Sequence, residues 1–306
     1  MSRVHDALKK AEQEKVLLGD PDRLMETKAP TAPGFHHLET ACAVANAESG
    51  AGQEELVAET FIERCSRQDW NTDPTLTQHV DARRHTLLSE EFRSLRSRLY
   101  LMRKVRPVQK LLVTSPLPEE GKTFVAANLA RVMAKQADSR VLLIDGDLRL
   151  SSLHAVLGAP AVPGLWEYLA GGFDLTSVIQ RGTGENLFFI PGGATAGNPS
   201  ELIGNGRFEL LMNRMAPVFD WIIIDSPPVI PVSDARMLAG FCDGVLMLVN
   251  AGTTPFDLAQ KACGEFQKNQ LLGVILNRVE PQETYGSYYY YGKGKHHKGN
   301  GKGVEV

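Results

Sequence analysis

The segment 111–135 constrains the fold more than any other part of the chain. An apolar run enters a loop ending in Gly121, Lys122 and Thr123, and the residues after the loop repeat at helical spacing. This order places the loop at a helix N-terminus, where free N–H groups and the helix dipole favour an anion. In such a Walker A loop the glycine admits a phosphate, the lysine reaches the β and γ oxygens, and the threonine hydroxyl ligates magnesium. The segment therefore predicts a site for ATP with Mg²⁺.

The loop departs from the GxxxxGK[ST] pattern, because Pro116 stands where the first glycine is expected and Glu119 adds a carboxylate. A chance Gly-Lys-Thr sequence in a loop is the alternative interpretation. Two hydrophobic runs farther along the chain argue against it, since they end in Asp145 and Asp225. Ligands of open α/β sheets gather at the carboxyl ends of strands, which is where these two acids are expected.

A third acid, Asp147, follows Asp145 at strand spacing. If the strand persists past Asp145, both side chains point the same way, towards the phosphates. Magnesium prefers oxygen ligands and keeps several waters, so Thr123 with one or two of the carboxylates suffices, which leaves a third to handle a proton. We expect Asp147 to take that role. The alternative is that these aspartates are helix caps or turn formers.

The remaining sequence alternates short apolar runs with helical stretches, which predicts an α/β fold of P-loop NTPase type. Its sheet is expected to be mainly parallel, with helices on both faces. The predicted organisation is a short amphipathic helix over 1–18, a largely disordered linker over 19–80, a P-loop domain over 81–280, and a flexible, basic, tyrosine-rich tail over 281–306.

Composition narrows the set of partners. The chain has 306 residues and a formal net charge of -3, so it has no global attraction to nucleic acid or anionic lipid, and no nucleic-acid partner is expected. It contains no run of roughly 18 apolar residues, the length that a membrane helix needs. If the protein works at a membrane, we expect another molecule to hold it there.

A helix is predicted to begin at Ser89, a plausible N-cap. The apolar residues next to Ser89 and after it form one stripe of this helix: Leu88, Phe92, Leu95 and Leu99. Glu90, Arg93 and Arg96 fall three apart on another face. Two interpretations stay open for this ladder, a solvated face with a weak ion pair and a contact between subunits.

The tail carries a group of tyrosines among glycine and serine: Tyr285, Tyr288, Tyr289, Tyr290 and Tyr291. Each phenol is a potential phosphoryl acceptor, and a flexible tail can reach a neighbour's active site. A sticky aromatic tail or an edge strand is the alternative interpretation.

Together these motifs resemble the bacterial tyrosine kinases of capsule and exopolysaccharide biosynthesis, a cytoplasmic autokinase family of P-loop rather than eukaryotic kinase architecture. The resemblance covers about Ser89 to Tyr291. It rests on the ExxRxxR ladder, the PxEGKT loop, the IDGDLR and IIIDSPP motifs, and the tyrosine cluster.

The resemblance implies transfer of the ATP γ-phosphoryl group to tyrosines of the tail. Lys122 and Thr123 are then expected on the nucleotide, Asp145 and Asp225 around Mg²⁺, and Asp147 beside the attacking phenol. Further nucleotide contacts are expected from Glu120, Gly121, Phe124 and Asn277, the last matching a position that contacts adenine in related ATPases.

The resemblance also implies partners. The ladder of Glu90, Arg93 and Arg96 mediates ring-like homo-oligomers in the family, and phosphorylation of the tails would loosen such a ring by repulsion. Family members without membrane spans depend on a separate membrane protein of the polysaccharide chain-length type, so we expect recruitment to the inner face of the plasma membrane and a cognate phosphatase. Glu119 replaces the family's usual glycine, which leaves loop flexibility and nucleotide affinity open.

Two rival functions remain. A partitioning or septum-positioning ATPase shares the sheet, but it carries a second signature lysine five residues before the loop lysine, where this chain has Leu117. A nucleotide-binding scaffold of the export machinery, with little or no catalysis, is the second rival. The presence of all expected catalytic residues argues against it.

Overall fold

The computed structural model describes residues 58–72, 87–137, 139–182 and 186–279. The predicted N-terminal helix over 1–18 and the tyrosine cluster of the tail lie outside these residues.

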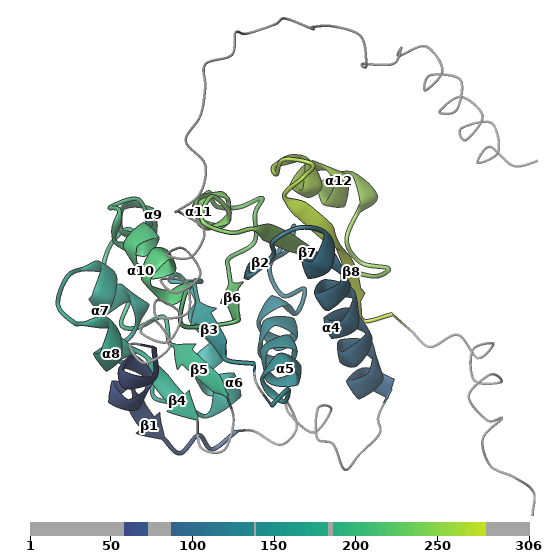
Figure 1. Ribbon diagram of the computed structural model, residues 1–306. Coiled ribbons are helices and arrows are strands. Elements are labelled where there is room, and N and C mark those ends of the chain that lie inside the picture. Colours follow the sequence, from purple (N-terminus) through teal and green to yellow (C-terminus); the bar gives the residue numbers. More distant parts are fainter. Residues whose placement is uncertain (1–57, 73–86, 138, 183–185, 280–306) are drawn as a thin grey trace, which may run out of the picture. The chain divides into compact units, whose positions relative to one another are not determined.

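The described residues form one eight-stranded sheet with the order β1-β4-β5-β3-β6-β2-β7-β8 (Figure 1). Neighbouring strands are parallel except for the pair β4–β5, so the expected mainly parallel sheet is confirmed. The strands are β1 (Ser66–Gln68), β2 (Lys110–Thr114), β3 (Val141–Asp145), β4 (Gln180–Gly182), β5 (Leu187–Ile190), β6 (Trp221–Asp225), β7 (Gly244–Asn250) and β8 (Leu271–Asn277).

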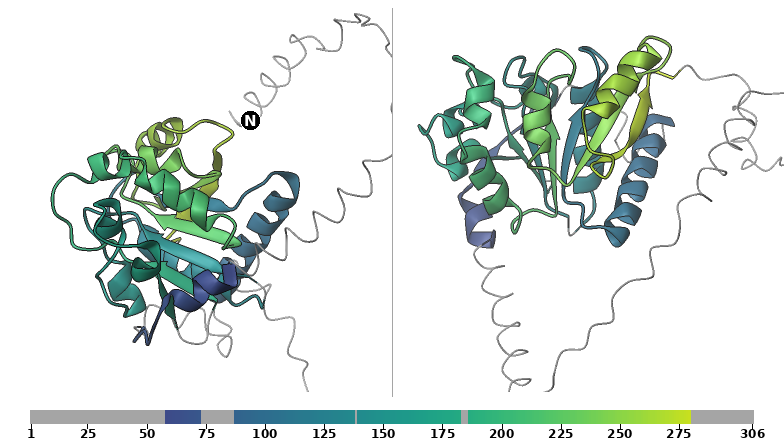
Figure 2. Two further views of the ribbon diagram at one scale, coloured as in Figure 1. Left: turned by 60° about the vertical axis from the view of Figure 1, so that its left-hand side comes forward. Right: turned by 90° about the horizontal axis from the view of Figure 1, so that it is seen from above.

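Helices cover both faces of the sheet, as the sequence predicted (Figure 2). One face carries α4 (Leu87–Val105), α5 (Lys122–Ala134) and α6 (Leu153–Leu157). The other face carries α7 (Leu165–Leu169), α8 (Leu175–Val178), α9 (Pro199–Ile203), α10 (Arg207–Met215), α11 (Asp234–Ala239) and α12 (Phe256–Gly264).

The central strands are apolar along their whole length because both of their faces are buried. In β3, Val141 and Leu143 pack into the core on the α5 side, whereas Leu142 and Ile144 pack into the core on the opposite side. Such two-sided burial is typical of parallel strands that lie between helix layers. Since β3, β6 and β2 are adjacent and parallel, their carboxyl ends bring three polar segments to one edge of the sheet.

Residues 58–72 depart from the expected disordered linker. Residues 58–64 are helical, and β1 follows as a parallel neighbour of β4. Ile62 and Cys65 are buried in the core, and the ring of Trp70 meets Phe189 edge-on with centroids 6.1 Å apart. Spacings of four and three residues between Ala58, Ile62 and Cys65 form a short helical stripe within a polar composition, and its burial orders the segment.

The prediction of a Ser89 N-cap is wrong. α4 begins at Leu87, so Ser89 lies inside the first turn of the helix. Leucine is a strong helix former, which favours the earlier start. The predicted stripe is confirmed at Phe92 and Leu99, which are buried against the α5 side of the core.

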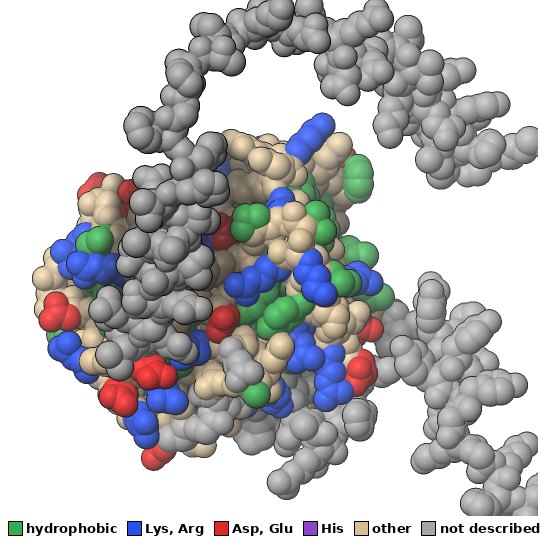
Figure 3. All heavy atoms as spheres, in the orientation of Figure 1, with side chains coloured by type: hydrophobic (Ala, Val, Ile, Leu, Met, Phe, Trp, Pro, Cys, Tyr) green, Lys and Arg blue, Asp and Glu red, His purple; other side chains and the backbone are tan. Residues whose placement is uncertain are grey.

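The two edges of the sheet differ in character. β1 is three residues long and polar, whereas β8 exposes Val274 by 49% and Leu276 by 63%. Exposed hydrophobic side chains accordingly lie on the side of the molecule that carries α12 and β8 (Figure 3). Within the described ranges, no helix is both long and apolar enough to cross a bilayer.

Candidate active site

The glycine-lysine-threonine loop connects β2 to α5, and Gly121 is required at its end for two reasons. Its φ of +95° lies in the left-handed region, and a Cβ at this position would lie 2.4 Å from Nδ2 of Asn277. α5 then begins at Lys122 with no side-chain cap on its first turn. The N–H groups in the first turn of this helix lie where the anion is expected to bind.

Glu119 has a φ of +61°, a backbone conformation that glycine adopts without strain. For a residue with a Cβ, the left-handed region costs roughly 1–2 kcal/mol. The geometry thus gives a physical reason for the glycine that the resemblance led us to expect here.

Glu120 fastens the loop to two neighbouring segments. Its side chain is buried, accepting a hydrogen bond from Leu117 N–H at 3.2 Å and another from the Thr254 hydroxyl. Its carbonyl accepts a bond from Nδ2 of Asn277 at 2.8 Å. The structure therefore assigns Asn277 a bracing contact with the loop, and its expected contact with adenine stays a prediction.

The three residues that open α5 have different surroundings. Lys122 is buried, and its charge lowers the pKa of Asp225 against a larger upward shift from burial. The Thr123 hydroxyl hydrogen-bonds with Asp225 and lies 3.5 Å from the Ser152 hydroxyl. The Phe124 ring packs against Phe92 of α4 with centroids 6.1 Å apart, so any nucleotide contact of Phe124 would come from its backbone rather than from its ring.

Asp145 and Asp225 lie side by side, in register at the carboxyl ends of β3 and β6. Both are buried, with exposed fractions of 0% and 1%, and one oxygen of each, Oδ1, has no hydrogen-bond partner. Burial raises the pKa of Asp145 to about 6. Burial and then the neighbouring Asp145 charge raise the pKa of Asp225 well above its usual range. Two buried like charges with free oxygens are the environment that a cation would stabilise.

The donors present fit Mg²⁺. Two carboxylate oxygens and the Thr123 hydroxyl are hard oxygen ligands, and magnesium usually takes only one or two protein carboxylates. In the part of the chain that the structure describes, no group of three or more histidine, cysteine, aspartate or glutamate side chains is arranged for a metal. The remaining ligands would accordingly be waters and phosphate oxygens.

The sequence did not reveal what holds Asp145 in place. Its Oδ2 accepts three hydrogen bonds from the start of α6: the Ser151 hydroxyl at 2.8 Å, Ser152 N–H at 3.1 Å and Leu153 N–H at 3.1 Å. The sequence did carry a sign of the helix start that makes these contacts, namely two serines before a helical run, because serine is a common helix N-cap. These contacts leave Oδ1 as the free oxygen.

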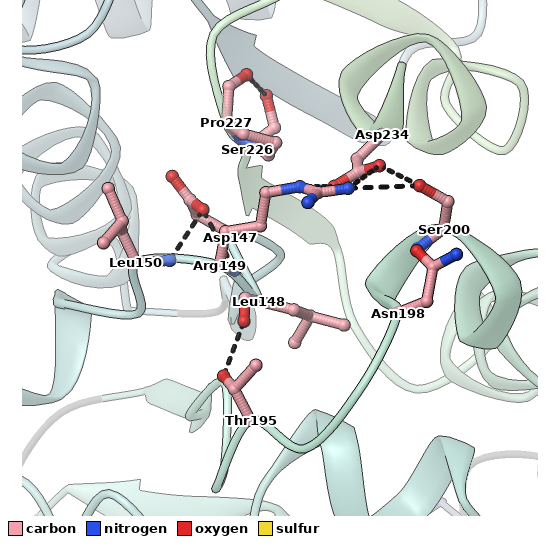
Figure 4. Close-up of polar contacts among 10 residues, drawn as sticks. All are labelled: Asp147, Leu148, Arg149, Leu150, Thr195, Asn198, Ser200, Ser226, Pro227 and Asp234. Atoms are coloured by element: carbon pink, nitrogen blue, oxygen red, sulfur yellow. Dashed lines mark hydrogen bonds and ion pairs between the residues drawn. The ribbon is translucent and has the colours of Figure 1, made fainter. Parts of the chain in front are cut away.

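Asp147 is not oriented by strand geometry, because β3 ends at Asp145. Its Oδ1 accepts N–H bonds from Arg149 at 3.3 Å and Leu150 at 3.1 Å, which close a turn after the strand. Its other oxygen points away from this turn (Figure 4). The half-buried Asp147 lies close enough for its charge to raise the pKa of both Asp145 and Asp225.

The three charged ladder residues of α4 make contacts within the subunit. Arg93 forms an ion pair with Glu90, and Arg96 donates a hydrogen bond of 3.0 Å to the carbonyl of Val132 in α5. The Glu90–Arg93 pair is partly exposed, so it contributes little to stability. The expected contact between subunits stays a prediction for all three residues.

The fold and the site define a class, the P-loop nucleotide-binding domains. Residues 111–290 match the family described as CobQ/CobB/MinD/ParA nucleotide binding domain. Within this class, the chain is 35% identical over 67% of its length to tyrosine-protein kinase CpsD of Streptococcus agalactiae, covering 90% of that protein. It is 32% identical to tyrosine-protein kinase YwqD of Bacillus subtilis (strain 168) over 68% of its length, covering 87% of the relative.

Solved structures agree with these relatives. The chimerical protein CapA2B2 superimposes with a TM-score of 0.64 at 31% sequence identity, covering 71% of this chain and 94% of that one. The chain therefore belongs to the bacterial tyrosine kinases and is a protein-tyrosine kinase that uses ATP.

The partitioning-ATPase rival shares the fold only as a distant relation. The septum site-determining protein MinD complexed with Mg-ADP, from Pyrococcus horikoshii OT3, superimposes with a TM-score of 0.50 at 26% identity, covering 57% of this chain and 72% of that one.

Proposed function

We propose that this kinase is an autokinase that transfers the γ-phosphoryl group of ATP to tyrosines of its own tail, namely Tyr285, Tyr288, Tyr289, Tyr290 and Tyr291. The observation that carries the proposal is the buried pair of Asp145 and Asp225, each with a free oxygen, beside the Thr123 hydroxyl at the start of α5. This arrangement supports binding of a nucleotide triphosphate together with a cation.

In the proposed reaction, Gly121 and the N-terminal N–H groups of α5 receive the phosphates, and Lys122 offsets their charge. Thr123, Asp145 and Asp225 would hold Mg²⁺, which when bound neutralises charge on the phosphate oxygens. The phenol oxygen attacks the γ-phosphorus while the bond to the β–γ bridging oxygen breaks, so that ADP leaves. Asp147 accepts the phenolic proton through its oxygen that points away from the turn.

The proposed setting is the control of exopolysaccharide or capsule polymerisation and export. Ring-like oligomers contacting through Glu90, Arg93 and Arg96 would carry one subunit's tail into the next subunit's site. A membrane activator of the chain-length-determinant type would recruit the kinase to the inner face of the plasma membrane, and a cognate phosphatase would reset it. Charge added to the tails would loosen the ring by repulsion.

The test mixes two complementary chains with Mg²⁺ and ATP and maps phosphotyrosine by mass spectrometry. One chain carries Lys122→Ala and an intact tail, and the other has an intact site but is truncated after Glu283. We expect each chain alone to form no phosphotyrosine in the tail, and the mixture to phosphorylate the Lys122→Ala chain between Tyr285 and Tyr291. Lys261→Ala, at an exposed position of α12, is the matched lysine control and should behave as the wild type.

The outcome separates the proposal from the scaffold. Phosphotyrosine in the wild type that persists in Lys122→Ala alone would show that the loop lysine is dispensable. Nucleotide hydrolysis without phosphotyrosine, even with a candidate membrane activator added, would favour a switch ATPase or a scaffold. Phosphorylation within the wild type but not in the mixture would leave the kinase intact and overturn transfer between subunits.

A further inference from the structure

The side chain of Arg149 joins the turn after β3 to two helices on the opposite side of the site (Figure 4). Its Nε donates to Oδ2 of Asp234 at 2.7 Å, and its Nη2 donates to Oδ1 at 3.2 Å. The same Nη2 lies 3.3 Å from the Ser200 hydroxyl, which itself donates to Oδ1 of Asp234. Two parallel N–H···O bonds from a planar guanidinium fix orientation as well as position.

The side chain of Asp234 is buried. Its exposed fraction is 1%, it is the first residue of α11, and both of its oxygens are used by Arg149 and Ser200. Ser200 lies in the first turn of α9. We call Arg149, Asp234 and Ser200 the arginine clamp.

The clamp holds the turn that carries Asp147. The backbone N–H of Arg149 donates to Oδ1 of Asp147, so a displaced Arg149 displaces the carboxylate. The same turn is fixed by Leu148, whose side chain is buried and whose carbonyl accepts a 2.6 Å bond from the Thr195 hydroxyl (Figure 4).

The far end of the clamp is tied to the other acidic segment. Asp234 lies nine positions after Asp225, and the connection between them is bonded to β2 and the start of the loop. The Ser226 hydroxyl donates to the Val113 carbonyl at 3.0 Å, and Val229 N–H donates to the Ser115 carbonyl at 2.9 Å. The clamp therefore sets the Asp147 turn relative to the segment that carries Asp225.

We propose that Asp234 and Ser200 are positioning residues for phosphoryl transfer: through Arg149 they hold the Asp147 carboxylate where the acceptor hydroxyl must arrive. This inference rests on the role of Asp147 under the proposed function. The hydrogen bonds of the clamp join Arg149, Asp234 and Ser200 to one another and not to the loop 115–123, so we expect it to act on the transfer step more than on nucleotide binding.

The first test separates the rate at saturating ATP from the KM for ATP in the full-length chain. We expect Asp234→Asn to lower the initial rate of tail phosphorylation about 10- to 100-fold, since a misplacement of about 1 Å can cost 100-fold in rate. The KM for ATP and the affinity for ADP should stay within about twofold. Arg149→Lys should show the same pattern, because lysine keeps the charge but cannot make the two-pronged contact.

The matched control is Arg236→Gln. It removes an ion pair from the same helix, α11, but its partner Glu265 lies outside the clamp. The rate of this variant should equal that of the wild type. If Asp234→Asn fails to fold, Ser200→Ala removes one hydroxyl from the clamp, and we expect it to lower the rate about threefold to tenfold with the same unchanged KM.

The second test asks whether Asp234 acts through Asp147. On the residual activity of Asp147→Asn, adding Asp234→Asn should change the rate by less than about twofold, because residues that act as one unit are not additive. Rates that multiply, or a nucleotide affinity that falls as much as the rate, would overturn the inference. If Asp147→Asn itself keeps the wild-type rate, the role of Asp147 is wrong. If Asp147→Asn loses activity while Asp234→Asn and Ser200→Ala do not, only the clamp is wrong.

Discussion

Replacing Gly121 by alanine brings a Cβ into the contact that braces the phosphate loop. The new atom would lie 2.4 Å from Nδ2 of Asn277, closer than two non-bonded atoms can approach. It would also hold alanine at a φ of +95°. The amide of Asn277 must then move away from the Glu120 carbonyl, to which it now donates at 2.8 Å.

The two effects can be given separate magnitudes. The left-handed backbone costs an alanine roughly 1–2 kcal/mol. Loss of the Asn277 hydrogen bond costs about 1 kcal/mol. We therefore expect Gly121→Ala to lower the free energy of unfolding by about 2–3 kcal/mol and to weaken nucleotide binding, because the braced loop is the phosphate site.

Urea denaturation of the wild type and four variants measures the backbone part and the contact part separately. Gly206 is a matched control, because it also has a left-handed φ, +83°, but a Cβ there would meet nothing within 4 Å. Gly206→Ala should therefore lose only the backbone part, roughly 1–2 kcal/mol. With Asn277→Ala already present, adding Gly121→Ala should cost about 1 kcal/mol less than it does in the wild type, because the clash is gone.

The reasoning would be refuted if Gly121→Ala and Gly206→Ala were equally destabilising and the first did not couple to Asn277→Ala. The cost would then be purely conformational, and Asn277 would not brace the loop.

Two further predictions concern stability. Glu119→Gly should raise the free energy of unfolding by about 0.5–1 kcal/mol, because relief of the left-handed backbone outweighs the greater freedom of glycine in the unfolded chain; Glu119→Ala should give no such gain in urea denaturation. Because burial raises the pKa of Asp145 to about 6, above roughly 3.9 in the unfolded chain, its contribution to stability is full below about pH 4 and is lost as pH rises through 6. Thermal unfolding without metal between pH 4.5 and 8 should show this fall, and Asp145→Asn should reduce it, leaving the part that comes from the raised pKa of Asp225.

Much of the fold could be predicted because its strands are buried on both faces. β3 and β6 read as unbroken apolar runs, and they end at Asp145 and Asp225, as predicted. β1 and β4 carry no such signal, since each is three residues long and polar. Their pairing depends on Ile62 and Trp70 packing nearby, and these contacts join segments far apart in the sequence.

The acids of the site were predictable for a related reason, because strand ends of a parallel sheet converge on one edge. The residues that hold those acids were not. Arg149 and Asp234 are separated by 85 positions, and Thr254 and Glu120 by 134. Side-chain pairs at such separations leave no periodicity in the sequence, so only the folded chain brings them together.

Burial distinguishes the three acids in a way that agrees with their proposed roles, in which Asp145 and Asp225 serve the cation and Asp147 serves the proton. Asp145 and Asp225 are out of reach of solvent, and each keeps one oxygen without a partner, so a cation stabilises them where water cannot. Asp147 is half-buried, with one oxygen used by its own turn and the other pointing away from it. An acid that accepts a proton from another chain's hydroxyl, as proposed, needs that exposure, and two backbone N–H bonds to Oδ1 hold the Asp147 carboxylate in its turn. The proposed division of roles thus follows from the end of β3 at Asp145. Asp145 still belongs to the buried strand, whereas Asp147, two residues later, lies in the turn that the arginine clamp holds.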